Sequence, residues 1–182
     1  MTETEETRLS FSGLALKTIV AHTITYFVAG VLAYKLGGYE KTFSQPPLSY
    51  LMRPTSDPLV MSGPLFQPIR GVIFASAFYP LRSVLFAERR GWLTLWWLLL
   101  ALGVLSTFGP ASGSVEGLVY TVIPPRAQIL GLWEVLLQSL LFSTLLFYWV
   151  NHPGKRWLDW TLGIAFIVLM SLTLLGLFVG RQ

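Results

Sequence analysis

The stretch Pro64–Phe86, PLFQPIRGVIFASAFYPLRSVLF, decides how this chain folds. It is apolar over the length of a membrane span, yet it carries Arg70 and Arg82 and is interrupted by Pro80. Twelve residues separate the two arginines, which places their Cα atoms roughly 18 Å apart on a helix, against a hydrocarbon core of about 30 Å. Both arginines therefore cannot lie at the membrane boundaries.

The two arginines differ in how easily they reach water. Arg82 lies close to the charged turn at Glu88, so its side chain can extend to the interface. Arg70 lies six residues inside Pro64, and a central arginine costs about 3 kcal/mol unless it finds an acceptor. Arg70 therefore needs either a route to the interface or a partner.

The composition defines the class of protein. Of 182 residues, 53% are hydrophobic and 12% are charged, whereas about a quarter are charged in soluble domains. We predict an all-α polytopic membrane protein, with a polar tail over 1–10 and a single transmembrane domain over 11–182. The net charge of +4 arises from basic residues beside apolar spans, which favours membrane topology over a nucleic-acid partner. The lack of cysteine excludes disulfides and thiolate-bound metals.

Apolar segments of sufficient length predict a bundle of about five transmembrane helices. The expected spans are 11–34, 64–86, 92–108, 128–150 and 158–180. Pro80 predicts a kink or local unwinding near Ser76, because proline cannot donate the helical hydrogen bond. Gly71 and Ala75 form a small-residue groove suited to a close helix contact, and GLFVG at 176–180 has the same character.

A polar stripe lies on one face of the first span. Thr18, His22 and Thr25 follow helical spacing. His22 either carries protons or binds a ligand, or it hydrogen-bonds to a neighbouring helix. The sequence offers no second histidine or carboxylate at ligand spacing, which favours the structural interpretation. We expect no metal and no cofactor.

Two long connections are not expected to form long helices. Residues 37–63 hold four prolines, which predicts a segment resting on the bilayer surface, or a lid. Residues 109–128, GPASGSVEGLVYTVIPPRAQ, begin with helix-breaking residues, and LVYTVI predicts a short extended run. This irregular segment between the third and fourth spans is either re-entrant or interfacial.

The distribution of Lys and Arg predicts the orientation of the chain. Five spans place the termini on opposite sides, and the short turns on the N-terminal side hold most of the basic residues near the membrane. The N-terminus is therefore expected in the cytoplasm and the C-terminus outside.

This topology brings several polar residues into one half of the membrane. The second and fourth spans both begin outside, and the loop after the third span closes over that half. We hypothesise that Arg70 pairs with Glu134 or Glu116 and that an outward-facing pocket is formed by six residues: Gln67, Arg70, Glu116, Tyr120, Glu134 and Gln138.

Three functions remain open on this sequence. No HExxH or GxSxG motif is present, which favours a non-catalytic subunit or assembly factor of a membrane complex. The alternatives are a small-solute carrier or substrate-binding component that uses the polar pocket, and a membrane-embedded lipid-headgroup enzyme that uses Glu116 and Arg70. The expected partners are the lipid bilayer and either further copies of the chain or other membrane subunits, without nucleic acid.

Overall fold

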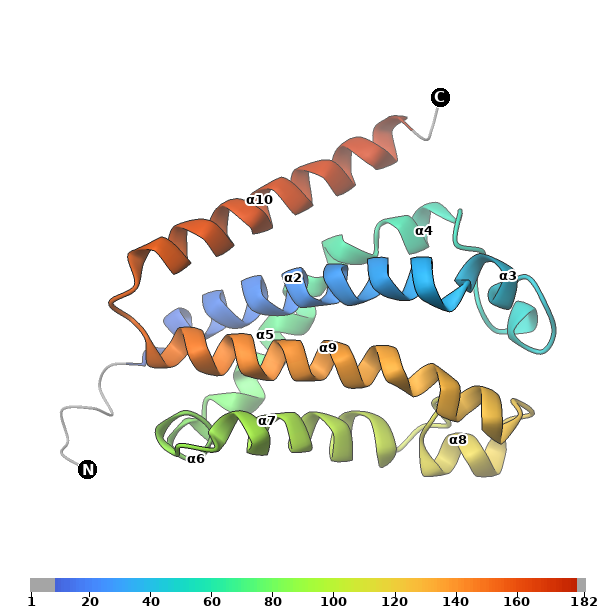
Figure 1. Ribbon diagram of the computed structural model, residues 1–182, viewed down its shortest axis with the longest axis horizontal. Coiled ribbons are helices and arrows are strands. Elements are labelled where there is room, and N and C mark those ends of the chain that lie inside the picture. The colour runs from blue at the N-terminus through green and yellow to red at the C-terminus, as the bar shows by residue number, and fades with distance from the viewer. Residues whose placement is uncertain (1–8, 180–182) are drawn as a thin grey trace.

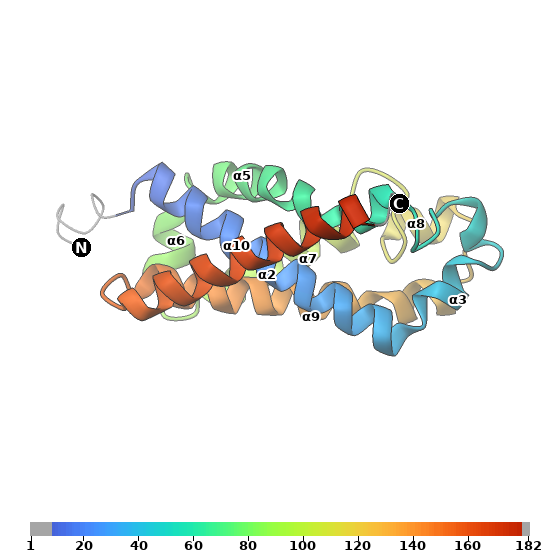
Figure 2. The same ribbon diagram turned by 90° about the horizontal axis from the view of Figure 1, so that it is seen from above.

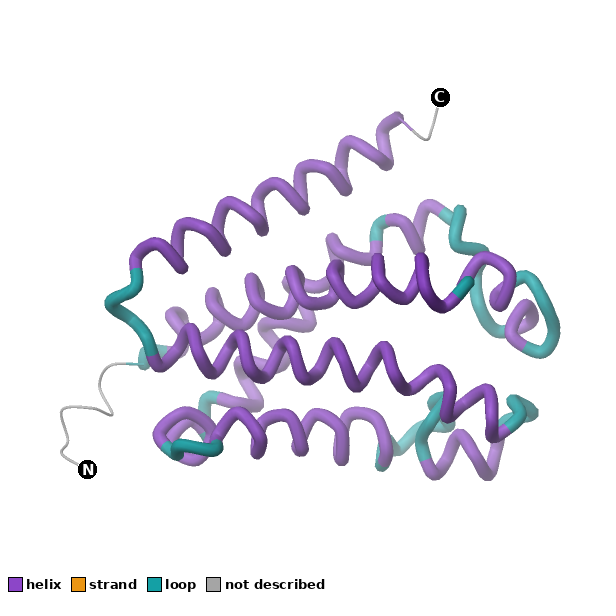
Figure 3. Tube along the Cα trace, viewed as in Figure 1, coloured by secondary structure: helices purple, strands orange, loops and turns teal. Residues whose placement is uncertain are grey.

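The computed structural model describes residues 9–179, apart from the side chains of Thr42 and Val179, and these residues form helices and loops without a strand (Figures 1 and 3). Three helices, α2 (Phe11–Gly37), α9 (Pro125–Asn151) and α10 (Arg156–Val179), are long and apolar enough to cross a membrane. They coincide with the first, fourth and fifth predicted spans. Gly180 lies outside the described residues.

The segment Pro64–Phe86 is not one helix. It comprises part of the 3-10 turn η2 (Gly63–Phe66), then α5 (Gln67–Phe78), and part of α6 (Arg82–Ala87). Of the kink or local unwinding predicted near Ser76, the structure has the unwinding, displaced towards Pro80: α5 ends at Phe78 and α6 begins at Arg82. Pro80 has no N–H to donate to the Ser76 carbonyl, so the last helical bond runs from Tyr79 N to Ala75 O at 2.9 Å. The chain then turns before α6 begins.

The third predicted span is shorter than expected. Helix α7 (Gly91–Leu100) continues into the π-helical turn η3 (Ala101–Leu105), so the apolar helix covers Gly91–Leu105 and leaves residues 106–108 in the following loop. At 1.5 Å per residue these fifteen residues reach roughly 22 Å, less than the hydrocarbon thickness of about 30 Å.

The extended run predicted at LVYTVI is wrong, because Val115–Tyr120 form helix α8. The Ser114 hydroxyl caps this helix by accepting a bond from Gly117 N at 2.9 Å, which outweighs the glycines that argued against a helix. Thr121, at the end of α8, is extended, and no helix includes residues 121–124, so only the first half of LVYTVI is helical. The proline-rich segment before Gly63 contains no long helix, as predicted. It forms three short helices: α3 (Tyr39–Phe43), η1 (Leu48–Tyr50) and α4 (Pro58–Met61).

The long helices pack around α2. In Figure 1, α9 lies beneath α2 and α7 lies beneath α9, while Figure 2 shows α5 along one side of α2. A Cβ on Gly71 would lie 2.6 Å from Ile19 Cα, so the backbones of α2 and α5 touch there. The predicted contact through Gly71 and Ala75 is confirmed, since both are buried. The core contains the buried side chains Leu14, Phe78, Leu85, Leu95, Phe142, Leu146 and Trp149.

Helix α10 is attached at one end of the bundle. Asp159 Oδ1 accepts a bond of 2.6 Å from Trp149 Nε1, and Lys17 Nζ donates to Trp149 O at 3.0 Å, which joins α2, α9 and α10. Towards its C-terminus α10 diverges from α2 (Figure 1). Gly176 has no atom near its would-be Cβ, so this part of the GLFVG motif makes no close contact within the described chain.

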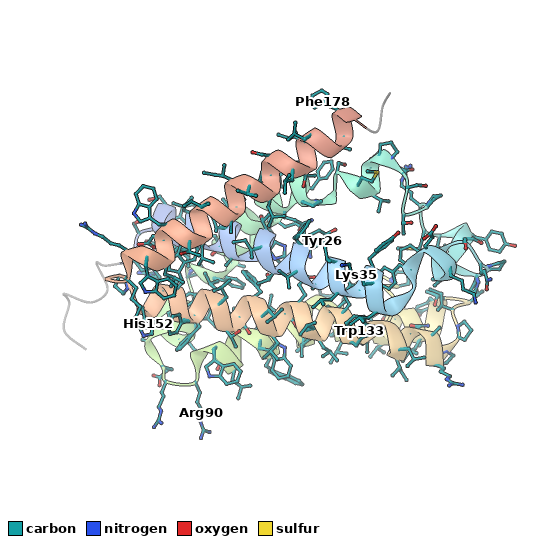
Figure 4. All side chains as sticks on the ribbon, turned by 45° about the horizontal axis from the view of Figure 1, so that its top comes forward. Tyr26, Lys35, Arg90, Trp133, His152 and Phe178 are labelled. Carbon is teal, nitrogen blue, oxygen red and sulfur yellow. The ribbon has the colours of Figure 1, made fainter. Side chains whose placement is uncertain are left out.

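The two ends of the molecule differ. One end, the basic end, holds the start of α2 and the turns α6–α7 and α9–α10, and Arg90 and His152 mark it in Figure 4. The opposite end, the loop end, holds α3, η1 and α8 (Figure 1).

Candidate functional site

A buried polar group that joins two helices is the side chain of Gln67, at the start of α5 and only 4% exposed. Its Oε1 accepts bonds from His22 Nε2 at 3.0 Å and from Arg70 Nη1 at 3.4 Å. Its Nε2 donates to Gly63 O at 2.9 Å. We call His22, Tyr26, Gly63, Gln67 and Arg70 the Gln67 cluster.

Helical spacing explains how the cluster assembles. His22 and Tyr26 are one turn apart on α2, and Gln67 and Arg70 are one turn apart on α5. A Cβ on Gly63 would lie 2.8 Å from Tyr26 Oη, so the tyrosine hydroxyl reaches η2 only because residue 63 is glycine. Figure 4 shows Tyr26 midway along the bundle.

His22 is held in place by aromatic rings as well as by Gln67. The centroids of Phe74 and Phe142 both lie 5.0 Å from the imidazole centroid, in edge-on contacts. Because Nε2 donates to Gln67, Nδ1 is the acceptor nitrogen, and it is buried without a hydrogen-bond partner among residues 9–179. The predicted hydrogen bond from His22 to a neighbouring helix is present.

Thr18 and Thr25, the other members of the predicted stripe, are also buried. Their hydroxyls donate to their own helix, to Leu14 O at 2.7 Å and to Ala21 O at 2.8 Å. These bonds satisfy the hydroxyl protons within α2 and leave His22 as the member of the stripe that reaches another helix.

Arg70 is exposed, and its guanidinium carbon lies 5.8 Å from the centroid of the Phe74 ring. No carboxylate in the described part of the chain lies within ion-pair distance of it, so neither Glu134 nor Glu116 forms the hypothesised pair. The Tyr26 hydroxyl interacts electrostatically with both Arg70 and Glu134. Tyr26 thus lies between the groups that the sequence suggested, and its only sequence signal was the one-turn spacing from His22.

Glu134 is half-buried on α9 and accepts a hydrogen bond from the Tyr39 hydroxyl of α3. Burial and this bond to a carboxylate raise the pKa of Tyr39 above its ordinary value. Gln138 is half-buried one turn further along α9. Glu134 therefore serves first to attach α3 to α9.

Glu116 and Tyr120 lie elsewhere. Both belong to α8, which lies beneath α9 in Figure 1, whereas η2 lies on the other side of α2. Tyr120 is 72% exposed. The structure thus brings Gln67 and Arg70 together, bonds Glu134 to Tyr39 instead, and leaves Glu116 and Tyr120 apart.

Gln128 forms a second polar centre that the sequence did not indicate, because it fell at the boundary of a predicted span. Its Oε1 accepts from Gly113 N at 3.1 Å, and its Nε2 donates to Gly117 O, Thr121 Oγ1 and Ile123 O at 2.8–3.2 Å. These bonds fix the loop around α8 to the start of α9.

Neither centre resembles a metal site, since no three His, Asp or Glu side chains gather anywhere between residues 9 and 179. The fold and these centres define a helical protein with three helices of membrane-spanning length. Comparisons with protein-family models, with curated proteins and with solved structures gave no match to this chain.

Proposed function

We propose that this chain is a non-catalytic subunit or assembly factor of a membrane complex, with α10 as its contact helix. The observation that carries the proposal is the exposure of α10: none of its most apolar 18-residue stretch is buried inside the chain, although Leu158 at its start belongs to the core. Side chains along its whole length, including Trp160, Ile167 and Phe178, are exposed.

The physical argument concerns what holds membrane helices together. Lipid tails are as apolar as leucine side chains, so helices associate through close packing and hydrogen bonds rather than through the hydrophobic effect. Within residues 9–179, helix α10 makes one side-chain hydrogen bond to the bundle, at Asp159. Gly163 and Gly176 leave open space on its surface, and such residues allow another helix backbone to approach.

We further propose that the chain crosses the membrane five times. The additional spans are the broken helix α5–α6, which runs from beside the middle of α2 to the basic end, and the short helix α7–η3, which leads back from that end. Arg89, Arg90, Lys155 and Arg156 all belong to turns at the basic end, which favours that end in the cytoplasm.

Because the chain has no cysteine, the topology can be tested directly with single-cysteine variants. We expect Ser112→Cys to react with a membrane-impermeant maleimide on intact cells and Glu88→Cys, in the turn between α6 and α7, to react only after lysis. Labelling of both positions from the same side would contradict five spans.

The subunit proposal is tested by purifying the tagged protein in a mild detergent and measuring the stoichiometry of the chains that accompany it. We expect one defined partner, or a second copy, that is lost in the variants Gly163→Leu and Gly176→Leu. The matched control is Gly103→Leu in η3, which also points to open space and should retain the partner. A monomer without partners, in detergent and after cross-linking in the membrane, would contradict the proposal.

A solute-binding or carrier function is the second candidate, and it is favoured by the exposed donor Arg70 beside the half-buried Tyr26 hydroxyl. Purification of the protein with a bound small molecule and without a partner chain would support this function. The enzyme alternative lacks comparable support, because Glu116 and Arg70, which it uses together, lie on different sides of the bundle.

A further inference from the structure

We propose that the Gln67 cluster binds the phosphate group of a membrane phospholipid, with the Arg70 guanidinium and the Tyr26 hydroxyl as hydrogen-bond donors. This proposal goes beyond the subunit function and does not depend on it. It follows from the balance of donors and acceptors, the rigidity of the cluster and the surface around it.

The cluster has more donors than acceptors. A guanidinium carries five N–H donors, and Arg70 uses one of them in a long bond of 3.4 Å. The Tyr26 hydroxyl donates to no acceptor among the residues that the structure places. The nearby acceptors are already occupied, because Gln67 Oε1 receives two donors and Gly63 O receives Gln67 Nε2. The missing component is therefore an acceptor, and the positive charge of Arg70 selects an anion.

The donors are held in place before any ligand arrives. Gln67 is bonded at both ends of its amide and anchors the guanidinium, while the Phe74 ring lies against it. Gly63 fixes the position that the Tyr26 hydroxyl can reach. Preorganised donors lose little conformational entropy on binding, which strengthens the affinity of a site with few contacts.

The surface around Arg70 indicates that the anion belongs to a lipid. Phe66, Ile69 and Ile73 on the same segment are exposed, with Ile69 and Ile73 at 61% and 62%. Such a surface faces hydrocarbon in a membrane, and an arginine within it extends towards the interface, where lipid phosphates lie. A phospholipid can place its phosphate at Arg70 and its acyl chains along Ile69 and Ile73, whereas a free phosphate ion has only the polar contacts.

One charged group opposes the ligand. Glu134 also interacts with Tyr26, and its carboxylate would repel a phosphate. The hydrogen bond from Tyr39 occupies one of its oxygens. The proposal therefore predicts that Glu134→Gln tightens lipid binding by about twofold, which a purely structural role for Arg70 would not produce.

The test is a native mass spectrometry titration of the purified protein with dioleoyl phosphatidylglycerol. We expect Arg70→Gln to weaken binding by about tenfold and Tyr26→Phe by about threefold, while Arg70→Lys falls between Arg70→Gln and the wild type. The control is Arg126→Gln, which removes an exposed arginine from the start of α9 and should change nothing. Should Arg70→Gln fail to fold, as judged by circular dichroism and gel filtration, Tyr26→Phe removes only a hydroxyl and decides the question.

Two further probes identify the source of the anion. Dioleoyl glycerol, which lacks the phosphate, should bind at least about tenfold more weakly than the phospholipid, and inorganic phosphate at the same concentration should not compete with it. Unchanged affinity in Arg70→Gln and Tyr26→Phe would overturn the site. Equal binding of dioleoyl glycerol, full competition by phosphate, or cross-linking of Arg70 to a partner's carboxylate would overturn the assignment to a lipid.

Discussion

The two buried glutamines behave differently, although both lie at the start of a helix. Gln128 is 1% exposed and satisfies both ends of its amide within the segment that contains α8. Gln67 also uses both ends, but one of its partners is the exposed guanidinium of Arg70. A polar network that closes on itself stabilises the fold, whereas one that ends in exposed donors is prepared for a ligand.

This difference predicts which substitutions affect stability and which affect binding. The largest loss of stability is expected for Gln128→Leu, at about 3 kcal/mol, because a buried N–H and several buried carbonyls lose their partner. Reversible unfolding in mixed micelles measures this change. The matched control is Gln138→Leu on the same helix, which should change the free energy of unfolding by less than about 0.5 kcal/mol. Equal effects of the two substitutions would show that Gln128 does not hold the loop.

The next largest loss of stability is expected at Gly71, where the close contact between α5 and α2 brings Gln67 to His22. Gly71→Ala places a Cβ against the α2 backbone at Ile19 and should cost about 2 kcal/mol through overpacking. Gly30→Ala on α2 meets open space and serves as the control. The same unfolding assay measures both variants, and a neutral Gly71→Ala would mean that α2 and α5 do not touch there.

Gln67→Leu should cost about 1.5 kcal/mol, less than Gln128→Leu, because Arg70 can turn towards the interface and only His22 Nε2 and Gly63 O stay buried without a partner. Lipid binding should fall in this variant together with stability. If stability falls and phosphatidylglycerol affinity does not, Gln67 is structural in the same sense as Gln128.

The smallest effect concerns the bond between Tyr39 and Glu134, for which Tyr39→Phe should cost about 1 kcal/mol. The raised pKa of Tyr39 in the folded protein also has a sign that can be checked. Its contribution to stability is fully present below the unfolded value of about 10 and is lost as the pH rises above it. A melting series from pH 8 to 11 should therefore show an alkaline decrease that is weaker in Tyr39→Phe, and identical curves would contradict this.

Sequence reasoning recovered the parts of the fold that depend on hydropathy and small residues. Helices α2, α9 and α10 follow from long apolar runs, and the α2–α5 contact follows from Gly71. One error arose where a local bond outweighed residue type, because Ser114 caps α8 despite the surrounding glycines. Pro80 interrupts the helix as the sequence allowed, but it ends α5 instead of bending it.

The candidate site was predicted in part, and the reason is geometric. Residue depth along the spans associated Arg70 with Gln67 and Glu134. Depth alone, however, does not determine the neighbour that each helix face contacts. In the sequence, Tyr26 resembles an ordinary aromatic residue of a membrane helix. Its role depends on how close its hydroxyl comes to Gly63 in η2, which the structure shows. Gln128 could not be recognised because its partners lie in a loop whose helix was not predicted.

The central claim is that Arg70 finds its anion in the lipid rather than in this chain. Phosphorus-to-nitrogen dipolar recoupling NMR, with labelled arginine in phosphatidylglycerol bilayers and Arg70→Lys to assign the signal, measures this directly. We predict that lipid phosphorus dephases the Arg70 guanidinium resonance strongly and that of Arg126 weakly. An Arg70 signal that phosphorus leaves unchanged would contradict the account.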